Sequence, residues 1–120
     1  MSNNETKLQQ EIRLAIGKIP TLRLFRNQVG QLPDPRTGRY VQFGLAKGSS
    51  DLIGFKKLKI TEDMIGQEIA QFVSIEIKTE KGKLTQQQNN WLTFIKQSGG
   101  ITGVARSIKD VFNILSLKQN

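Results

Sequence analysis

Residues 72–78 of the chain, Phe-Val-Ser-Ile-Glu-Ile-Lys, predict the strand around which the rest is organised. β-branched and aromatic residues crowd into this stretch, as is typical of a β-strand. Because successive side chains of a strand point to opposite faces, the alternate apolar residues share one face, which we expect to pack in the core. These residues are Val73, Ile75 and Ile77. The opposite face carries Ser74, Glu76 and Lys78, so an acid and a base stand together on a polar face.

A second short apolar run, Gly-Ser-Ser-Asp-Leu-Ile-Gly-Phe at residues 48–55, opens with a single carboxylate, Asp51. If the two strands are neighbours, Asp51 lies beside Glu76 and Lys78. Two carboxylates and a lysine on one sheet face suit a hard cation, because such ions take oxygen ligands. The alternative without chemistry is a simple surface ion pair between Glu76 and Lys78.

Residues 5–18 predict an amphipathic helix that Pro20 terminates. Its apolar residues fall on one stripe at helical spacing: Leu8, Ile12, Ala15, Ile16 and Ile19. On a helical wheel Glu5 lies near the centre of that stripe, whereas Glu11 points away from it. A carboxylate that faces the core needs a partner, because burying an unpaired charge is costly. The alternative is that Glu5 only favours the positive N-terminal end of the helix.

The middle of the chain predicts short strands separated by turns. Residues 21–29 read as a strand, residues 30–38 as a turn-rich loop around Pro-Asp-Pro, and residues 40–43 as a short strand. Residues 61–66 predict a turn between two antiparallel strands.

Residues 86–97 predict a helix with Thr85 as its N-cap. Gln88 borders the apolar face of this helix. It is therefore either a satisfied residue at the edge of the core or a residue that reaches the polar face of the strand at 72–78.

A short apolar strand is predicted at residues 101–106, followed by a final helix. Ser107, with Asp110 three residues on, resembles a capping box in which Asp replaces Glu. The helix carries more apolar residues than one stripe needs: Val111, Phe112, Ile114, Leu115 and Leu117. They serve either ordinary core packing or an interface with a second copy of the chain.

With 120 residues the chain is expected to form one domain over residues 1–120. It contains no cysteine and no histidine, which excludes disulfides, zinc–thiolate sites, a thiol nucleophile and a histidine base. Any metal must be held by oxygen, which favours Mg²⁺, Mn²⁺ or Ca²⁺. The net charge of +8 favours a polyanionic partner such as nucleic acid. No apolar run is long enough for a membrane span or a signal peptide, so we expect a cytoplasmic protein without a membrane partner.

Five short motifs make the acid–lysine pattern more specific because they occur in one order along nearly the whole chain. They are Glu5-Thr-Lys-Leu-Gln9, Arg26-Asn27-Gln-Val-Gly30, Gly48-Ser-Ser-Asp51, Ile75-Glu-Ile-Lys78 and Gly82-Lys-Leu-Thr-Gln-Gln-Gln88-Asn-Asn-Trp91-Leu92. Together they resemble the virus-type replication-repair nuclease (VRR-NUC) family of the PD-(D/E)XK superfamily, whose stand-alone members are mostly encoded by phages and prophages. The resemblance implies an α/β fold with a restriction-endonuclease-like core, in which helices flank a central mixed β-sheet.

The resemblance also implies roles for individual residues. The expected metal ligands are Glu5, Asp51, Glu76 and the backbone carbonyl of Ile77, with Glu11 as the alternative to Glu5. Asp51, Glu76, Lys78 and Gln88 are the expected catalytic residues. The expected cofactor is Mg²⁺ or Mn²⁺.

The function that the resemblance implies is a metal-dependent DNA endonuclease, structure-specific for branched DNA such as four-way (Holliday) junctions and acting as a homodimer. Basic residues near the expected site would contact DNA phosphates: Arg23, Arg26, Arg36, Arg39, Lys47, Lys81 and Lys83. One alternative is a basic nucleic-acid-binding module without catalysis. Clustered acids argue against it, since they repel phosphate unless a cation intervenes. A restriction-type endonuclease is a further alternative, but we see no added recognition domain.

Overall fold

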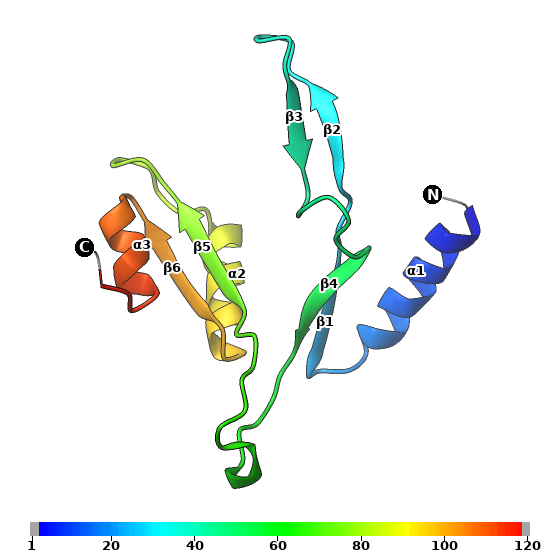
Figure 1. Cartoon of the computed structure of the whole chain (residues 1–120), viewed down its shortest axis with the longest axis vertical. Coiled ribbons are helices and arrows are strands. Elements are labelled where there is room, and N and C mark those ends of the chain that lie inside the picture. The colour runs from blue at the N-terminus through cyan, green and yellow to red at the C-terminus, as the bar shows by residue number, and fades with distance from the viewer. Residues whose placement is uncertain (1–2, 119–120) are drawn as a thin grey trace. The chain divides into compact units, whose positions relative to one another are not determined.

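The structure, a computed structural model, describes residues 3–118. The chain divides into two compact units, the first ending at Leu58 and the second beginning at Lys59, and each is described by itself (Figure 1). The elements follow in the order α1 (Asn3–Ile16), β1 (Leu22–Arg26), β2 (Gly30–Pro33), β3 (Tyr40–Phe43), β4 (Leu52–Lys56), η1 (Glu62–Met64), β5 (Val73–Ile77), α2 (Gln86–Gln97), β6 (Ile101–Ala105) and α3 (Ile108–Ile114). Helices accompany small sheets with both parallel and antiparallel pairing, which confirms the predicted α/β class.

In the first unit, β1 pairs antiparallel with β4, and β2 pairs antiparallel with β3. The prediction of a turn from residue 30 to 38 is wrong for its first part, because β2 begins at Gly30. Gly30 lies opposite Phe43, and a Cβ at Gly30 would stand 2.4 Å from the Phe43 ring. The glycine therefore serves a close approach inside a strand pair rather than a turn.

The first helix is confirmed, but the predicted burial of its apolar stripe is wrong. Leu8 is 56% exposed and none of the described residues of α1 is buried. The helix packs against β1, which belongs to a two-stranded sheet. A sheet of two strands is too narrow to cover the whole stripe of a 14-residue helix.

In the second unit, β5 and β6 form a parallel pair in which Ile75 lies opposite Gly103. A Cβ at Gly103 would stand 2.5 Å from Ile114, so α3 packs closely on that face. The most buried apolar side chains of the described chain are Leu92, Ile95 and Ala105. The core of this unit therefore lies between the two strands and their two helices.

The two faces of β5 are only partly as predicted. Ile75 is half-buried on the α3 side, but Val73 is 44% and Ile77 66% exposed. Ser74 and Glu76, on the opposite face, are half-buried because their side chains contact α2. The apolar face of β5 is thus not the simple core face that the alternation predicts, since within residues 3–118 the sheet of β5 has β6 as its one other strand.

The predicted turn at residues 61–66 is confirmed: η1 occupies residues 62–64 and Gly66 has a positive φ of 87°. The prediction that this turn joins two antiparallel strands is wrong for the described residues, because β4 pairs with β1 and β5 pairs with β6. No helix among residues 3–118 is long and apolar enough to cross a bilayer.

The last helix begins as predicted, with Ser107 accepting a hydrogen bond from the backbone N–H of Asp110 at 3.1 Å. Four of the five apolar residues that exceed one stripe are half-buried in their own unit, and Leu117 alone among them is exposed, at 55%. This favours ordinary packing for most of the α3 face.

Candidate active site

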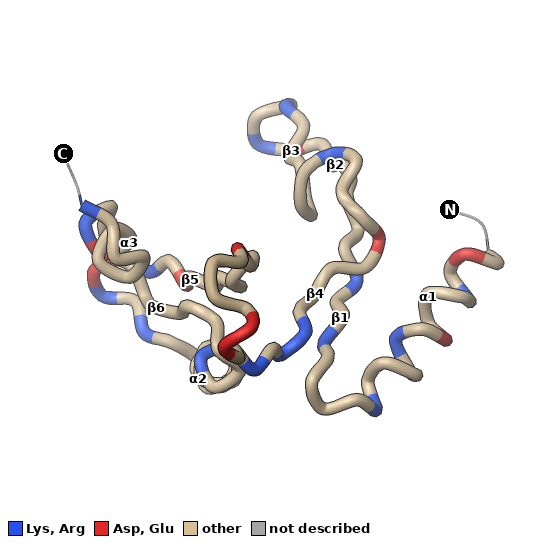
Figure 2. The backbone as a smooth tube through the Cα atoms, turned by 60° about the horizontal axis from the view of Figure 1, so that its bottom comes forward, with Lys and Arg blue, Asp and Glu red and all other residues tan. Residues whose placement is uncertain are grey.

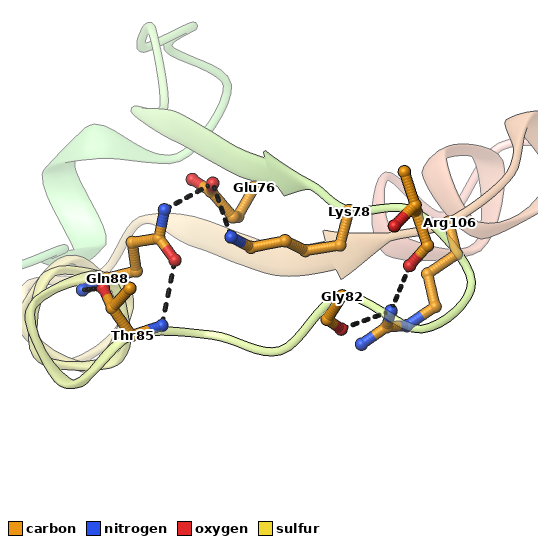
Figure 3. Close-up of polar contacts among 7 residues, drawn as sticks. Glu76, Lys78, Gly82, Thr85, Gln88 and Arg106 are labelled. Atoms are coloured by element: carbon orange, nitrogen blue, oxygen red, sulfur yellow. Dashed lines mark hydrogen bonds and ion pairs between the residues drawn. The ribbon is translucent and has the colours of Figure 1, made fainter.

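The acid and the base of β5 lie next to each other. Lys78 follows the last residue of β5, and its N–H extends the strand pairing by donating to the carbonyl of Ala105 at 3.1 Å. Its Nζ lies 3.8 Å from Oε1 of Glu76 (Figure 3). The exposed fractions are 19% for the Lys78 side chain and 33% for that of Glu76. The pair is thus partly withdrawn from solvent, unlike an ordinary surface ion pair.

Gln88 fixes the direction of the Glu76 carboxylate. Its Nε2 donates to Oε1 of Glu76 at 2.9 Å, while its own Oε1 accepts from the N–H of Thr85 at 3.0 Å. Thr85 Oγ1 accepts in return from the N–H of Gln88 at 3.1 Å, which completes a capping box at the start of α2. Because the amide oxygen is held by the helix cap, the amide NH₂ is turned toward Glu76.

Both sequence-based alternatives for Gln88 are therefore correct at once. It is a satisfied residue at the edge of the core, and it reaches the polar face of β5. One turn of α2 further on, Trp91 Nε1 donates to Ser74 Oγ at 2.8 Å, so a second hydrogen bond joins α2 to the same strand face. The residue pattern alone does not predict this contact between Trp91 and Ser74.

Arg106 anchors the loop that follows Lys78, a role that sequence reasoning missed. Its NH1 donates to the carbonyl of Gly82 at 2.7 Å (Figure 3), and also to those of Thr79 at 2.5 Å and Glu80 at 3.3 Å. A Cβ at Gly82 would stand 3.5 Å from both Cβ and Cδ of Lys78, so this loop lies along the lysine stem. The only sequence signal was an arginine placed between an apolar strand and a helix cap.

The loop before β4 holds Asp51 through its backbone. Asn27 donates from Nδ2 to Ser49 Oγ at 2.7 Å and to the Ser50 carbonyl at 2.9 Å, and its Oδ1 accepts from the N–H of Leu45 at 3.1 Å. The Asn27 N–H donates to the carbonyl of Asp51 at 2.8 Å. One side chain thus ties both ends of the loop at residues 45–50, directly before the predicted metal ligand.

The predicted ligands are distributed over both units. Glu5 lies in the first turn of α1 and is exposed, as is Glu11, so helix position alone does not separate them. Asp51 belongs to the first unit and Glu76 to the second. Among residues 3–118 no cluster of three carboxylates is preassembled. The convergence of these acids stays a prediction.

The donor set suits a hard cation. The two side-chain contacts of Glu76 both use Oε1, so neither occupies Oε2. The Asp51 side chain is exposed next to a loop held by Asn27. Carboxylate and carbonyl oxygens are the ligands that Mg²⁺ and Mn²⁺ take in proteins.

The predicted DNA-binding residues differ in how available they are. Arg23 is half-buried and donates to the carbonyls of Leu22 at 2.7 Å and Pro20 at 3.4 Å. The others are exposed: Arg26, Arg36, Arg39, Lys47, Lys81 and Lys83. Arg26 also lines a cavity of about 350 Å³ together with Arg13 of α1, which is not among the predicted DNA-binding residues.

Comparison with known families gives one match. The family model described as the VRR-NUC domain matches residues 3–109. The match spans both units and includes Glu5, Asp51, Glu76, Lys78 and Gln88. No curated protein and no solved structure matches the chain.

Proposed function

Because the chain belongs to the VRR-NUC family, we propose that it is a metal-dependent endonuclease that cuts branched DNA such as four-way junctions. The family is part of the PD-(D/E)XK nuclease superfamily, so the chain is a nuclease and its substrate is DNA. We propose three further properties beyond nuclease activity: dependence on a metal ion, preference for branched DNA, and assembly as a homodimer. We further propose that residues 1–120 act as a single nuclease domain.

The observation that carries the proposal is the arrangement of Lys78, Glu76 and Gln88. Phosphodiester hydrolysis needs a positioned water and relief of the charge that builds on the phosphate. Lys78 Nζ, held 3.8 Å from Glu76, can orient that water or stabilise the charge. Gln88 keeps the Glu76 carboxylate in one orientation by its 2.9 Å hydrogen bond, which removes the need to reorganise it during the reaction.

We propose that Glu5, Asp51, Glu76 and the carbonyl of Ile77 hold Mg²⁺ or Mn²⁺. The exposed oxygens of Asp51 and the Oε2 atom of Glu76 support this ligand set. Such an ion, when bound, supplies a Lewis acid for the phosphate and a more acidic water. PD-(D/E)XK nucleases generally use divalent metals, which is the family-level support for this step.

The proposed partner surface is basic. The net charge of +8 favours phosphate contacts, and Lys81 and Lys83 follow the catalytic lysine on the loop that Arg106 anchors. A four-way junction presents two equivalent strands, so symmetric cutting requires two active sites. One protomer carries one Asp51–Glu76–Lys78 set, and we therefore propose a two-fold homodimer.

The test is incubation with labelled linear duplex, flap and four-way junction DNA in Mg²⁺, Mn²⁺, Ca²⁺ or chelator. We expect paired nicks in the junction with Mg²⁺ or Mn²⁺, no cutting with chelator, and a sedimentation mass near twice the 13.5 kDa of the chain. Glu76→Gln should lose this cutting, whereas the control Glu68→Gln should cut like the wild type, because Glu68 is an exposed acid outside the proposed site. Cutting that is unaffected by chelator would contradict metal dependence. Equal cutting of duplex and junction would contradict structure specificity.

A further inference from the structure

The β2–β3 hairpin of the first unit is an exposed two-stranded ribbon. In Figure 1 it continues beyond the β1–β4 pair of the same unit, from cyan into teal. Among residues 31–43 every residue is exposed except Asp34, which is half-buried. A pair of strands exposed on both faces is marginal by itself, which suggests a partner.

The tip of this hairpin is closed by a set of hydrogen bonds around Asp34. The N–H of Asp34 donates to the Arg39 carbonyl at 2.7 Å, and the Asp34 carbonyl accepts from the N–H groups of Thr37 and Gly38. Asp34 Oδ1 also accepts from the N–H of Arg36 at 2.9 Å. Gly38 has a φ of 71°, which glycine adopts without strain. A tip ordered in advance loses little conformational entropy when it binds.

The charge that the tip presents to solvent is positive. The Arg36 side chain is 89% exposed, and its Nε lies 3.5 Å from Oδ1 of Asp34, whose side chain is only 16% exposed and is tied into the turn. Arg39 is exposed as well. Asp34 offsets one of the two arginine charges, so the tip keeps a net positive charge. In Figure 2 basic positions, in blue, mark the turn that joins β2 and β3.

The strand register divides the hairpin into two unlike faces. Paired residues of an antiparallel ladder point to the same side. Gln31 lies opposite Gln42, and Tyr40, 69% exposed, lies two pairs further toward the tip and therefore on the same side. Leu32 and Val41 form the next pair and point to the other side. One face is therefore polar and aromatic, and the other is apolar.

We propose that the Gln31–Tyr40–Gln42 face of this hairpin enters the major groove of a duplex arm, with Arg36 and Arg39 on the flanking phosphates; this rests on the proposed nuclease function. The major groove admits a two-stranded β-ribbon, and glutamine pairs with adenine there through two hydrogen bonds. The positive tip complements the phosphates, which is why DNA fits this face better than a second copy of the basic chain.

The hairpin thereby gives the nuclease a duplex-reading arm on the same unit as Asp51. Arginine at the tip sets the position of the ribbon on the DNA, since phosphate contacts carry no sequence information. The two glutamines and Tyr40 add contacts to base edges, so binding should show a modest preference for A·T pairs at one place in the arm.

The first test is fluorescence anisotropy of a labelled four-way junction in Ca²⁺, without Mg²⁺ or Mn²⁺. Binding is then measured apart from cleavage, so failure of this inference is distinguishable from failure of the proposed catalysis. A plot of log affinity against log salt has a negative slope. The double variant Arg36→Ala/Arg39→Ala should make this slope shallower by about 2, because two phosphate contacts are lost. An unchanged slope would overturn the phosphate contacts.

The second test asks whether the Gln31–Tyr40–Gln42 face lies in the major groove. Junction arms in which 7-deazaadenine replaces adenine lose the N7 acceptor of the major groove but keep their base pairing. Wild-type protein should bind them about tenfold more weakly, and the Gln31→Ala/Gln42→Ala variant should bind both DNAs equally. Equal binding of both DNAs by the wild type would overturn the proposal.

Val41→Thr is the matched control, because Val41 neighbours Tyr40 and Gln42 in β3 but points to the other face. It keeps a β-branched side chain, and we expect unchanged affinity for DNA. A loss in Val41→Thr equal to that in Gln31→Ala/Gln42→Ala would overturn the assignment of faces. If the glutamine variant instead changed the sedimentation mass and left DNA affinity intact, the face would contact a second chain and the proposal would be wrong.

Discussion

Glu76 and Asp51, the two carboxylates of the proposed metal site, are held in different ways by their own units. Glu76 is held through its side chain, by the amide of Gln88 at 2.9 Å and by Lys78 at 3.8 Å. Asp51 is held through its backbone, by the N–H of Asn27 at 2.8 Å and by the loop that Asn27 ties. The first arrangement fixes where a carboxylate points, and the second fixes where its Cα lies.

The difference separates two tasks of the site. A carboxylate with fixed partners keeps its orientation whether or not an ion is bound. The surrounding side chains therefore need not rearrange when the reaction occurs. A carboxylate fixed only at its backbone can still turn toward an ion that arrives. We therefore expect the second unit to hold the preorganised part of the site and the first unit to supply an adjustable ligand.

The largest expected effect comes from removing either carboxylate. Asp51→Ala and Glu76→Ala should each lower single-turnover cleavage by on the order of 10³-fold, as should Lys78→Ala. Cleavage is measured on the four-way junction, and circular dichroism checks folding. Wild-type rates in two of the three variants would show that the site is misassigned.

A smaller effect is expected from Gln88, which holds Glu76 without being a proposed ligand. Gln88→Ala should reduce activity about 10–100-fold, the range for residues that orient metal ligands, and raise the Mg²⁺ concentration needed for half-maximal rate. Gln88→Glu separates the two roles of this residue. Glutamate also completes a capping box, so thermal stability should be kept, but it cannot donate to Glu76.

Gln87→Ala is the control, since Gln87 is exposed in the same turn of α2. We expect wild-type activity from it. If Gln88→Glu were as active as the wild type with the same Mg²⁺ requirement, Gln88 would serve only the helix cap.

A smaller effect again is expected from replacing Arg106 or Asn27, the two residues that hold the loops around the site. Arg106→Gln should free the carbonyls of the loop at 79–82, and Asn27→Ala should free the loop at 45–50. Each change should cost about 1–3 kcal/mol in the free energy of unfolding and about tenfold in cleavage. Urea unfolding measures the first effect, and cleavage of the four-way junction measures the second. Lys109→Gln and Gln28→Ala are exposed controls nearby, and equal losses in these controls would contradict the anchoring roles.

What the sequence predicts well in this chain is what neighbouring residues determine. The strand at 72–78, the Thr85 cap and the pairing of Glu76 with Lys78 follow from spacing alone, and all three are present. The motif order also gives the family, which the match over residues 3–109 confirms.

What the sequence does not predict depends on which element lies beside which. Arg106 reaches carbonyls more than 20 residues away, and no local pattern indicates that. Gly30 resembles a turn residue until Phe43 is known to lie opposite it. The stripe of α1 predicts a buried face, but burial requires a partner wide enough to cover the helix, and helical spacing says nothing of the partner.

The smallest expected effect concerns Glu5, and it sharpens the comparison within the first unit. If Glu5 adds a ligand beside Asp51, Glu5→Gln should weaken Mg²⁺ activation several-fold, while Glu11→Gln, on another face of the same helix, should leave it unchanged. Both side chains are exposed, so loss of fold does not confuse the result. A Mg²⁺ titration of cleavage rate decides between them. If Glu5 only favoured the N-terminal end of α1, Glu5→Gln would lower helix stability slightly without moving the Mg²⁺ midpoint. A larger shift in Glu11→Gln would mean that the other face of α1 carries the ligand, and that the wheel position of Glu5 misled the assignment.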